Sequence, residues 1–240
     1  MTTRSATQPA GALPQESPPD APAAAAEPLG RRERKKQDTQ RRIFEAAEDL
    51  FTRKGYAAVT TQEIAEAADI GAGTLFRYAQ NKAELLIMVM NERLRLGARH
   101  GLVAAQDGAS AAEAVVALVE PLVQAAISQR ENTTVYQREV LFGAEGPHRA
   151  QALTRIRDLE DAVATVLRRC VDGRRDRTDD EVERAATAVF SVLYLKLVRL
   201  ELRDEYANGV QPQALFQELR LDVDHLIRGL LGTGTASTGR

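Results

Sequence analysis

The regular parts of this chain repeat apolar residues every three or four positions, which is the period of a helix. Between residues 38 and 54, and again from residue 81, these repeats place apolar side chains on one face of an amphipathic helix. Gly55 follows the first helix as a typical C-terminal stop. No alternating strand pattern persists, so we expect an all-α fold. The two patterns consist of Ile43, Ala46, Ala47, Leu50 and Phe51, then Leu85, Leu86, Val89 and Met90.

Residues 60 to 79 read TTQEIAEAADIGAGTLFRYA and predict two short helices joined by a tight turn. Thr60 and Glu63 have the spacing of a capping box, which starts the first helix. Asp69-Ile70-Gly71 breaks that helix, and Leu75 lies on the inward side of the second. Such a pair is either a helix-turn-helix, whose second helix fits the major groove of DNA, or a hairpin of the kind that any small helical protein contains.

From about residue 100 onward the pattern predicts helices only. A second capping box, at Thr178 and Glu181, opens one of them, and Pro121 marks a kink in another. We expect about nine helices, three in a DNA-binding head (residues 37–82) and six in a ligand-binding and dimerisation domain (residues 83–233). The predicted helices of the second domain after its connecting helix are Ser110–Gln129, Asn132–Phe142, His148–Val171, Thr178–Tyr206 and Pro212–Leu231.

The two ends of the chain have the composition of unfolded segments. Residues 1–30 are rich in Ala, Pro, Gln and Ser, with almost no large apolar side chain, so they cannot bury enough surface to fold. Arg31 to Lys36, RRERKK, is either the solvated start of the first helix or a flexible basic arm that binds phosphates or a minor groove. We therefore expect a disordered segment with a basic arm at residues 1–36, and a flexible tail at residues 234–240.

Composition and charge favour a cytoplasmic binding protein. The chain has 240 residues, of which 44% are hydrophobic, enough for a sizeable core. Residues 31–82 carry eleven Lys or Arg against eight Asp or Glu, whereas the rest of the chain is net acidic, the polarity of a DNA-binding module on an acidic body. No signal peptide is visible, and Lys196 and Arg199 interrupt the most apolar run, so we expect no membrane span.

The residues that would carry catalysis or bind a metal are scattered. Cys170 is the only cysteine, so an intrachain disulfide is excluded, and His100, His148 and His225 lack the spacing of a metal site. Cys170 and His148 would be about six helical turns apart on one helix, too far to form a nucleophile and base. We expect no enzyme activity, no metal and no cofactor.

The head resembles the tetracycline-repressor-like (TetR) family of bacterial regulators. The resemblance covers about sixty residues and rests on four segments in order: LFTRKGY from Leu50, IAEAADI from Ile64, GTLFRY from Gly73 and NKAELL from Asn81. The chain also departs from the family pattern. The family usually has Gly where Asp69 stands, a polar residue at Gly71, Tyr at Phe76 and a large apolar residue at Ala79.

The resemblance implies which residues meet DNA. Arg77 is the candidate for a base contact, since a guanidinium can pair with guanine O6 and N7, and it could equally bind a phosphate. Thr61 and Lys82 lie at helix N-termini, where backbone N–H groups attract phosphate. The major-groove set is Ala72, Gly73, Thr74, Phe76 and Arg77, and the DNA-backbone set is Thr61, Gln62, Tyr78, Asn81 and Lys82.

The resemblance also implies a homodimer and a small-molecule pocket in the second domain. The helix from Thr178 shows two apolar stripes, and one suffices to pack it onto its own domain. We expect the more apolar stripe to meet a second copy; the alternative is that both are intramolecular core. The interface candidates are Phe190, Leu193, Leu197, Leu200, Leu219 and Leu226. The second stripe is Ala188, Val192, Leu195 and Leu202. The pocket candidates are Met88, Tyr136, Arg138, Phe142, His148, Phe190 and Tyr194.

The sequence therefore predicts a DNA-binding transcriptional regulator, a repressor that an unidentified small-molecule effector releases from a palindromic operator in double-stranded DNA. The alternative is a regulator with the same head that binds DNA or a protein partner without a small-molecule ligand.

Overall fold

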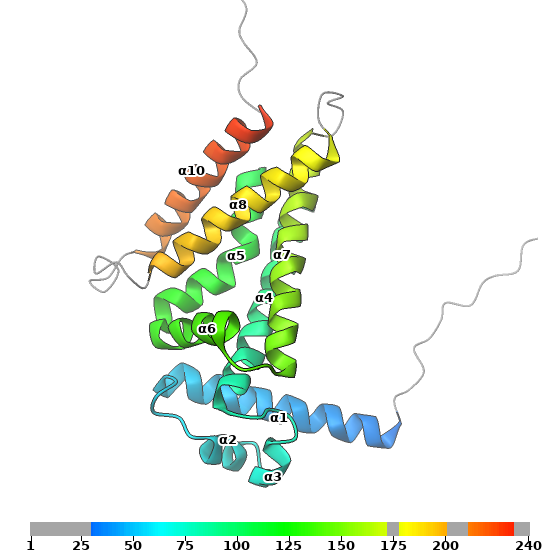
Figure 1. Ribbon diagram of the computed structural model, residues 1–240, viewed down its shortest axis with the longest axis vertical. Helices are drawn as coiled ribbons and strands as arrows, with labels where there is room; N and C mark the ends of the chain where they lie inside the picture. Colours follow the sequence, from blue (N-terminus) through cyan, green and yellow to red (C-terminus); the bar gives the residue numbers. More distant parts are fainter. Residues whose placement is uncertain (1–29, 172–177, 201–210, 233–240) are drawn as a thin grey trace, which may run out of the picture.

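The computed structural model describes residues 30–171, 178–200 and 211–232. The regular elements in these ranges are nine helices and no strands, which confirms the predicted all-α fold. Figure 1 shows a head of one long and two short helices beneath a taller body. The head contains α1 (Arg31–Lys54), α2 (Thr61–Ala67) and α3 (Ala72–Leu75), and α4 (Lys82–Gln106) leads into the body. The body continues with α5 (Ala111–Ser128), α6 (Arg130–Phe142), α7 (Pro147–Val171), α8 (Asp179–Leu200) and α10 (Pro212–Leu231).

The first helix is longer than the prediction. It begins at Arg31, so the segment from Arg31 to Lys36 forms its first turns, and the flexible-arm interpretation of these six residues is wrong. The run contains only Arg, Lys and Glu, which are good helix formers, and it has no Gly or Pro to stop the helix. Figure 1 shows this end of α1 reaching beyond the body. The predicted disorder of residues 1–29 lies outside the described residues.

The head is built around the buried face of α1. Ile43, Ala47 and Phe51 of that face are buried, and they form one cluster with Ile64 of α2 and Leu75 of α3. Burying a large aliphatic or aromatic side chain stabilises the fold by about 1.5–3 kcal/mol. These contacts fix α3 to the head from its inner side, leaving its outer side free.

In the body, α4 packs most closely against α5. A Cβ built on Gly97 would lie 2.1 Å from the carbonyl oxygen of Leu118, and one on Gly101 would lie 2.6 Å from that of Ala114. Only glycine permits this approach of the two backbones. By length and composition α5 is also the one described helix that could cross a membrane, but half of its apolar window is buried inside the body, as in a core helix.

The other predicted helix bounds are close to the observed ones. The capping box of Thr178 is present, with its N–H donating to Glu181 at 2.9 Å, and α8 starts at the next residue. The predicted loop at residues 173–177, the end of this helix near Tyr206 and the tail at 234–240 lie outside the described residues. The prediction placed the start of α6 two residues too late, because the polar residues Arg130 and Glu131 add no apolar position to the helical pattern.

Candidate DNA-binding interface and its attachment to the body

The turn between α2 and α3 has the geometry of a helix-turn-helix. Thr60 and Glu63 form the predicted capping box at the start of α2, with Glu63 N–H donating to the Thr60 hydroxyl at 3.1 Å. Asp69 has a φ of 51°, the left-handed region that Gly adopts most readily. This conformation explains why a glycine suits the position, and aspartate is among the few other residues that tolerate it. Ile70 is half-buried against the head core.

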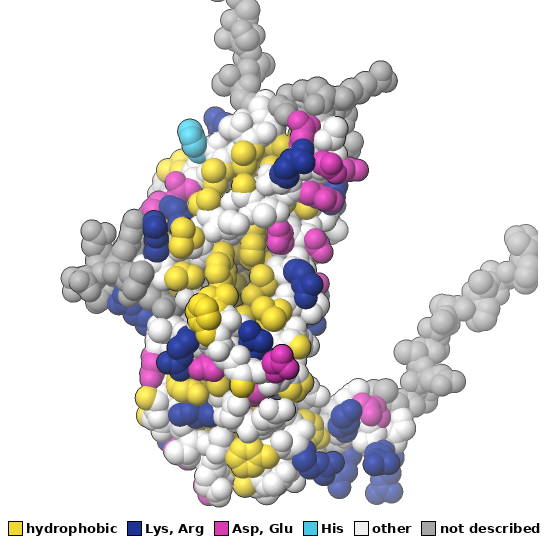
Figure 2. Space-filling model, viewed as in Figure 1, with side chains coloured by type: hydrophobic (Ala, Val, Ile, Leu, Met, Phe, Trp, Pro, Cys, Tyr) yellow, Lys and Arg dark blue, Asp and Glu magenta, His cyan; other side chains and the backbone are white. Residues whose placement is uncertain are grey.

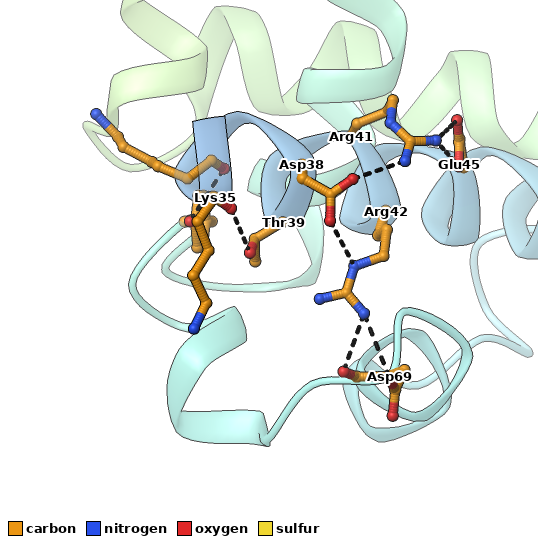
Figure 3. Close-up of polar contacts among 9 residues, drawn as sticks. Lys35, Asp38, Thr39, Arg41, Arg42, Glu45 and Asp69 are labelled. Atoms are coloured by element: carbon orange, nitrogen blue, oxygen red, sulfur yellow. Dashed lines mark hydrogen bonds and ion pairs between the residues drawn. The ribbon is translucent and has the colours of Figure 1, made fainter. Parts of the chain in front are cut away.

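Helix α1 holds this turn in place through Arg42. Its Nη1 donates to the carbonyl oxygen of Asp69 at 3.3 Å and lies 3.4 Å from the Asp69 carboxylate. On its own helix, Arg42 Nε lies 3.5 Å from the carboxylate of Asp38. Figure 3 shows Arg42 reaching from α1 to the turn, while Arg41 lies on the other side of Asp38. The turn thus has a polar tie to α1 besides its buried contacts.

The outer side of α3 is exposed. Leu75 is fully buried, whereas Phe76 is 49% exposed and Arg77 is also exposed. The guanidinium of Arg77 has no hydrogen-bond or ion-pair partner among the described residues. A Cβ on Gly73 would meet nothing within 4 Å, so the surface there is bare backbone. Of the five predicted major-groove residues, Gly73, Phe76 and Arg77 are exposed, and Ala72 and Thr74 are half-buried.

The predicted DNA-backbone residues surround this surface but differ in availability. Thr61 is half-buried at the start of α2, and the exposed Gln62 donates to Glu66 at 2.8 Å. Asn81 is the N-cap of α4, so its Oδ1 is occupied by the N–H of Glu84 at 2.9 Å. The hydroxyl of Tyr78 donates to the carbonyl oxygen of Lys36 at 3.4 Å, which ties the turn after α3 to α1.

Lys82 does not fit its predicted role as a phosphate contact. Its ammonium donates to the carbonyl oxygens of Tyr56 and Val59, both at 2.9 Å, and lies 4.2 Å from the centroid of the Tyr56 ring. The side chain therefore points into the loop between α1 and α2. Three carbonyl acceptors and an aromatic face provide partners for the whole ammonium group, so Lys82 holds the loop between α1 and α2 within the head.

Positive charge is concentrated at one end of the head. Arg31, Arg32, Arg34, Lys35 and Lys36 are all exposed in the first turns of α1. Figure 2 shows these Lys and Arg side chains gathered where α1 extends past the body. Such a cluster attracts a phosphate backbone without reading base sequence.

Hydrogen bonds attach the body to the head at the C-terminal end of α1. Asn132 of α6 is buried and its Nδ2 donates to the carbonyl oxygen of Phe51 at 2.8 Å. Beside it, Gln129 donates to the hydroxyl of Thr52 at 3.0 Å. Glu131 accepts the backbone N–H of Ala57 at 2.9 Å, in the loop that follows α1. The start of α6 is thus fastened to the end of α1.

A second attachment joins the start of α7 to α4 and α3. Glu84 is 4% exposed, and its carboxylate accepts the backbone N–H groups of His148 at 3.0 Å and Arg149 at 3.1 Å. A carboxylate at a helix N-terminus is stabilised by the unpaired N–H groups and the helix dipole. Nε2 of His148 donates to the carbonyl oxygen of Tyr78 at 2.9 Å. Sequence reasoning missed Glu84, because its place near the start of α4 predicts a local role.

The predicted pocket residues separate into three groups. Tyr136, Phe190 and Tyr194 lie near one another: the two rings of α8 stack at 6.2 Å, and Tyr194 contributes to the raised pKa of Tyr136, whose main cause is burial. The buried Tyr136 hydroxyl has no hydrogen-bond partner in the described part of the chain. Arg138 and Phe142 are exposed on α6, so assigning them to an enclosed pocket was wrong. Met88 and His148 instead line a cleft between the head and the body.

The predicted dimer stripe also needs correction. Leu193, Leu197 and Leu219 are buried within a single chain and cannot face a second copy. The most apolar stripe of α8 is the one that the body itself requires for its core. Phe190 and Leu226 are half-buried against the same core, and nothing is described of the Leu200 side chain. The second stripe faces outward at Leu195, which is 48% exposed, whereas Ala188 and Val192 are half-buried and Leu202 lies outside the described residues.

The described residues contain no group of three or more His, Cys, Asp or Glu side chains that could hold a metal ion. Cys170 and His148 lie near opposite ends of α7. Cys170 is half-buried, its thiol donates to the carbonyl oxygen of Val166 at 3.5 Å, and burial raises its pKa. A raised pKa keeps the sulfur protonated, which makes it a poor nucleophile.

Known proteins resemble this chain in its head and in its overall fold. The model of the bacterial regulatory proteins of the tetR family matches residues 43–89. The HTH-type transcriptional regulator YvkB of Bacillus subtilis is 43% identical over 54 residues, which are 22% of this chain and 29% of the relative. The HTH-type transcriptional repressor KstR of Rhodococcus jostii is 37% identical over 54 residues, which are 22% of this chain and 26% of the relative. The matched segment thus spans less than a third of these relatives.

Solved structures extend the likeness to the body. Thermus thermophilus FadR, a TetR family transcriptional repressor in complex with lauroyl-CoA, matches with a TM-score of 0.60 and 21% identity, covering 84% of this chain and all of that one. A TetR transcriptional regulator from Rhodococcus sp. RHA1 matches with a TM-score of 0.57 and 20% identity, covering 80% of this chain and 97% of that one. At these identities the matches establish the fold alone.

Proposed function

We propose that this chain, which belongs to the TetR family of bacterial regulatory proteins, is a homodimeric repressor that reads a palindromic operator with α3 and leaves it when a small molecule binds in the body. The observation that carries the proposal is the contrast between the inner side of α3 and the turn that follows it. Leu75 is fixed in the core, while the neighbouring Phe76 and Arg77 face outward without partners in the head. A helix held from one side and exposed on the other is suited to enter a major groove.

Some residues of the exposed surface contact the DNA bases, and others contact the DNA backbone. Arg77 provides bidentate hydrogen bonds for a guanine, and Phe76 offers an apolar contact for a thymine methyl group. Gly73 lets the backbone approach the base edges. Thr61, Gln62, Tyr78 and Asn81 lie around the exposed surface of α3, where they position the head on the DNA backbone.

The basic end of α1 extends this surface. Five basic side chains against the single acidic Glu33 are exposed from Arg31 to Lys36. Since the segment is helical, it presents these charges on a rigid rod about 9 Å long rather than on an arm that wraps DNA. We assign it to phosphates that flank the half-site.

The dimer forms through the outward stripe of α8 together with α10. Leu195 of α8 is 48% exposed and Leu221 of α10 is 66% exposed. The two helices are held side by side, because Lys196 lies 3.0 Å from Glu218 and also pairs with Asp222. Figure 2 shows hydrophobic side chains gathered over α8 and beside it. A two-fold pairing of this surface would cover them and place two heads on two half-sites.

The effector site lies around Tyr136, Phe190 and Tyr194. A buried hydroxyl without a partner is a polar anchor in an aromatic setting, which is the usual make-up of a small-molecule site. Tyr136 is one helical turn after Asn132, which holds the carbonyl of Phe51 at the end of α1. A ligand that moves this part of α6 therefore acts directly on the head. Two similar structures, of Thermus thermophilus and Bacillus subtilis FadR, contain lauroyl-CoA and stearoyl-CoA, so acyl-CoA molecules are the first class to test.

Selection from a random duplex pool, followed by affinity measurements, tests the DNA-binding proposal. The parent should select a palindrome, and Arg77→Ala should lose preference at one base position in each half-site, costing about 1–3 kcal/mol there. Arg157→Ala, on the exposed side of α7, is the control and should select and bind like the parent. Unchanged selection by Arg77→Ala would show that α3 does not read bases through this residue.

Release by a ligand is tested separately. Lauroyl-CoA should raise the melting temperature of the parent and lower its affinity for the selected operator, and Tyr136→Phe should weaken both effects. If a broad set of acyl-CoA molecules and apolar compounds changes neither property, the regulator works without a small-molecule ligand.

A further inference from the structure

A cleft of about 360 Å³ lies between the head and the body, apart from the aromatic site around Tyr136. Its walls come from α1, α4 and α7. Figure 1 shows α1 passing beneath the lower ends of the other two helices. The volume is at the lower end of the range for small-molecule sites, so the cleft fits a compact organic molecule.

The cleft is lined by an excess of positive charge. Each wall contributes one guanidinium: Arg41 from α1, Arg95 from α4 and Arg155 from α7. Among the described residues that line the cleft, Glu92 is the only carboxylate, and it pairs with Arg95. Figure 3 shows the guanidinium of Arg41 turned away from the Asp69 turn to which Arg42 is bound. Three guanidinium groups against one carboxylate favour an anionic ligand.

The present partners of these arginines can be exchanged for a ligand. Arg41 is 2.7 Å from Asp38 and 2.9 Å from Glu45, and Arg155 is 3.1 Å from Asp158. All are pairs within one helix, between side chains at least one-third exposed. Such pairs contribute little to stability because water already solvates both charges. An anion that binds two or three of the arginines together loses little by displacing them.

A buried polar group at the cleft points to a ligand independently of the charges. Asn91 is 4% exposed, and its Nδ2 donates to the carbonyl oxygen of His148 at 3.0 Å and to Oε1 of Gln151 at 3.2 Å. Its Oδ1 is buried and has no partner in the described chain. An acceptor buried without a donor costs free energy, and a ligand N–H or O–H would remove that cost.

The remaining lining residues define the rest of the ligand. Phe44 of α1 is half-buried and Met88 of α4 is buried, so the cleft has an apolar part as well as a charged one. An aromatic side chain and a thioether pack well against a flat ring or a short hydrocarbon.

We propose that this cleft is a second effector site, which binds a compact organic anion with a carboxylate or phosphate, a hydrogen-bond donor and an apolar ring or chain. The anion contacts arginines from the head helix α1 and from α7 of the body, so its binding ties the head to the body in this arrangement. Binding itself does not depend on the proposed repressor function, but an effect on operator affinity does.

The test uses the full chain without DNA and four probes: salicylate, phenyl phosphate, the uncharged benzamide and inorganic phosphate. Salicylate and phenyl phosphate should bind in isothermal titration calorimetry and raise the melting temperature. Comparing these two probes distinguishes a carboxylate from a phosphate ligand. Benzamide and inorganic phosphate should bind at least about 10-fold more weakly, because benzamide carries no negative charge and inorganic phosphate has no apolar ring, and about 10-fold corresponds to about 1.4 kcal/mol.

Two variants locate the site. Arg155→Gln should weaken the better probe about 10-fold or more, or about 1.4 kcal/mol. Arg157→Gln changes an arginine on the exposed side of the same helix and should bind like the parent. Asn91→Leu removes the unpaired oxygen and should also weaken binding. Its circular dichroism spectrum and melting temperature without probe separate this effect from a change in folding.

Three results would overturn the proposal. These are no binding of either aromatic anion at low-millimolar concentration, binding of inorganic phosphate as tight as that of phenyl phosphate, and an equal effect of Arg155→Gln and Arg157→Gln on probe binding. A probe that binds as expected but leaves operator affinity unchanged would confirm the site and contradict only its coupling to the head.

Discussion

The ammonium of Lys82 lies 4.2 Å from the centroid of the Tyr56 ring and donates to the carbonyl of the same residue at 2.9 Å. The first residue of α4 thereby fixes the loop between α1 and α2, and with it the start of the helix-turn-helix. A residue that the sequence predicts to contact the DNA backbone thus stabilises the architecture that presents α3.

Lys82→Ala should destabilise the head. The variant leaves the carbonyls of Tyr56 and Val59 without their charged donor, and hydrogen bonds to charged groups contribute about 1.5–3 kcal/mol each. We expect a loss of that order in the free energy of unfolding, measured by urea denaturation. Lys35→Ala, at an exposed site of α1, should be as stable as the parent. A fully stable Lys82→Ala protein whose DNA binding has lost about one unit of salt dependence would restore Lys82 as a phosphate contact.

Asp69 should tolerate Gly better than a branched residue. Its φ of 51° is unfavourable for L-residues by about 1–2 kcal/mol, and least so for Gly, Asn and Asp. The free energy of unfolding of Asp69→Gly should be within about 0.5 kcal/mol of the parent's. Glycine removes the backbone strain at the turn, and this gain offsets the greater conformational freedom of the unfolded chain. Asp69→Val should lose about 1–2 kcal/mol. Equal stability of the two variants in urea would mean that the turn relaxes to another conformation.

Gly97 and Gly229 are both helical glycines that should respond in opposite directions to alanine. At Gly97 the new Cβ would lie 2.1 Å from the carbonyl oxygen of Leu118, so α4 and α5 must separate. We expect a net loss of about 1–3 kcal/mol despite the better helix propensity of alanine. A Cβ built on Gly229 would meet nothing within 4 Å, so alanine there should raise the free energy of unfolding by about 0.5–1 kcal/mol. Thermal unfolding of both variants checks the pair; a stabilised Gly97→Ala would contradict the close packing of α4 and α5.

The Glu63 capping box should make the head sensitive to acid. Hydrogen bonds from Lys54 and from Thr60 lower the pKa of Glu63 from 4.5 to about 2. Because the folded-state pKa is below the unfolded value, the stabilisation is complete above pH 4.5 and is lost as the pH falls through about 2. The parent should therefore be more stable than Glu63→Gln near neutral pH, and the difference should shrink across that window.

Urea midpoints of both proteins at several pH values measure this effect. Glu145→Gln, in the exposed loop before α7, provides the control for loss of one negative charge and should show no such convergence. A difference between the parent and Glu63→Gln that does not change with pH would mean that the carboxylate charge is not the stabilising feature.

The two stripes of α8 should respond differently to charge. Leu193 is 1% exposed, so Leu193→Glu would bury a carboxylate without a partner and should unfold the chain. Leu195→Glu combined with Leu221→Glu changes exposed positions, so the double variant should stay helical, become monomeric and lose high-affinity operator binding. Light scattering and circular dichroism separate the outcomes. A double variant that remains a dimer would place the interface elsewhere.

Much of the local structure could be predicted because its signals lie within a few residues. The capping boxes of Thr60 and Thr178 are four-residue patterns, and both start helices as predicted. The 3.6-residue period of apolar residues predicted the helices of the head and the body, because each helix buries one continuous face. The exposure of Arg77 beside the buried Leu75 is also a local consequence of helical spacing.

What the sequence could not determine depends on residues that are distant along the chain. Lys82 binds carbonyls more than twenty residues away, and Glu84 caps a helix that begins 63 positions later. Both contacts exist only because the tertiary fold brings two helix ends together. The sequence shows two apolar stripes on α8, and only the packing of α8 against α7 and α10 decides that Leu193 faces the core and Leu195 faces solvent. Helix formation is decided by near neighbours, whereas the direction in which each face points is decided by whichever distant surface buries it best.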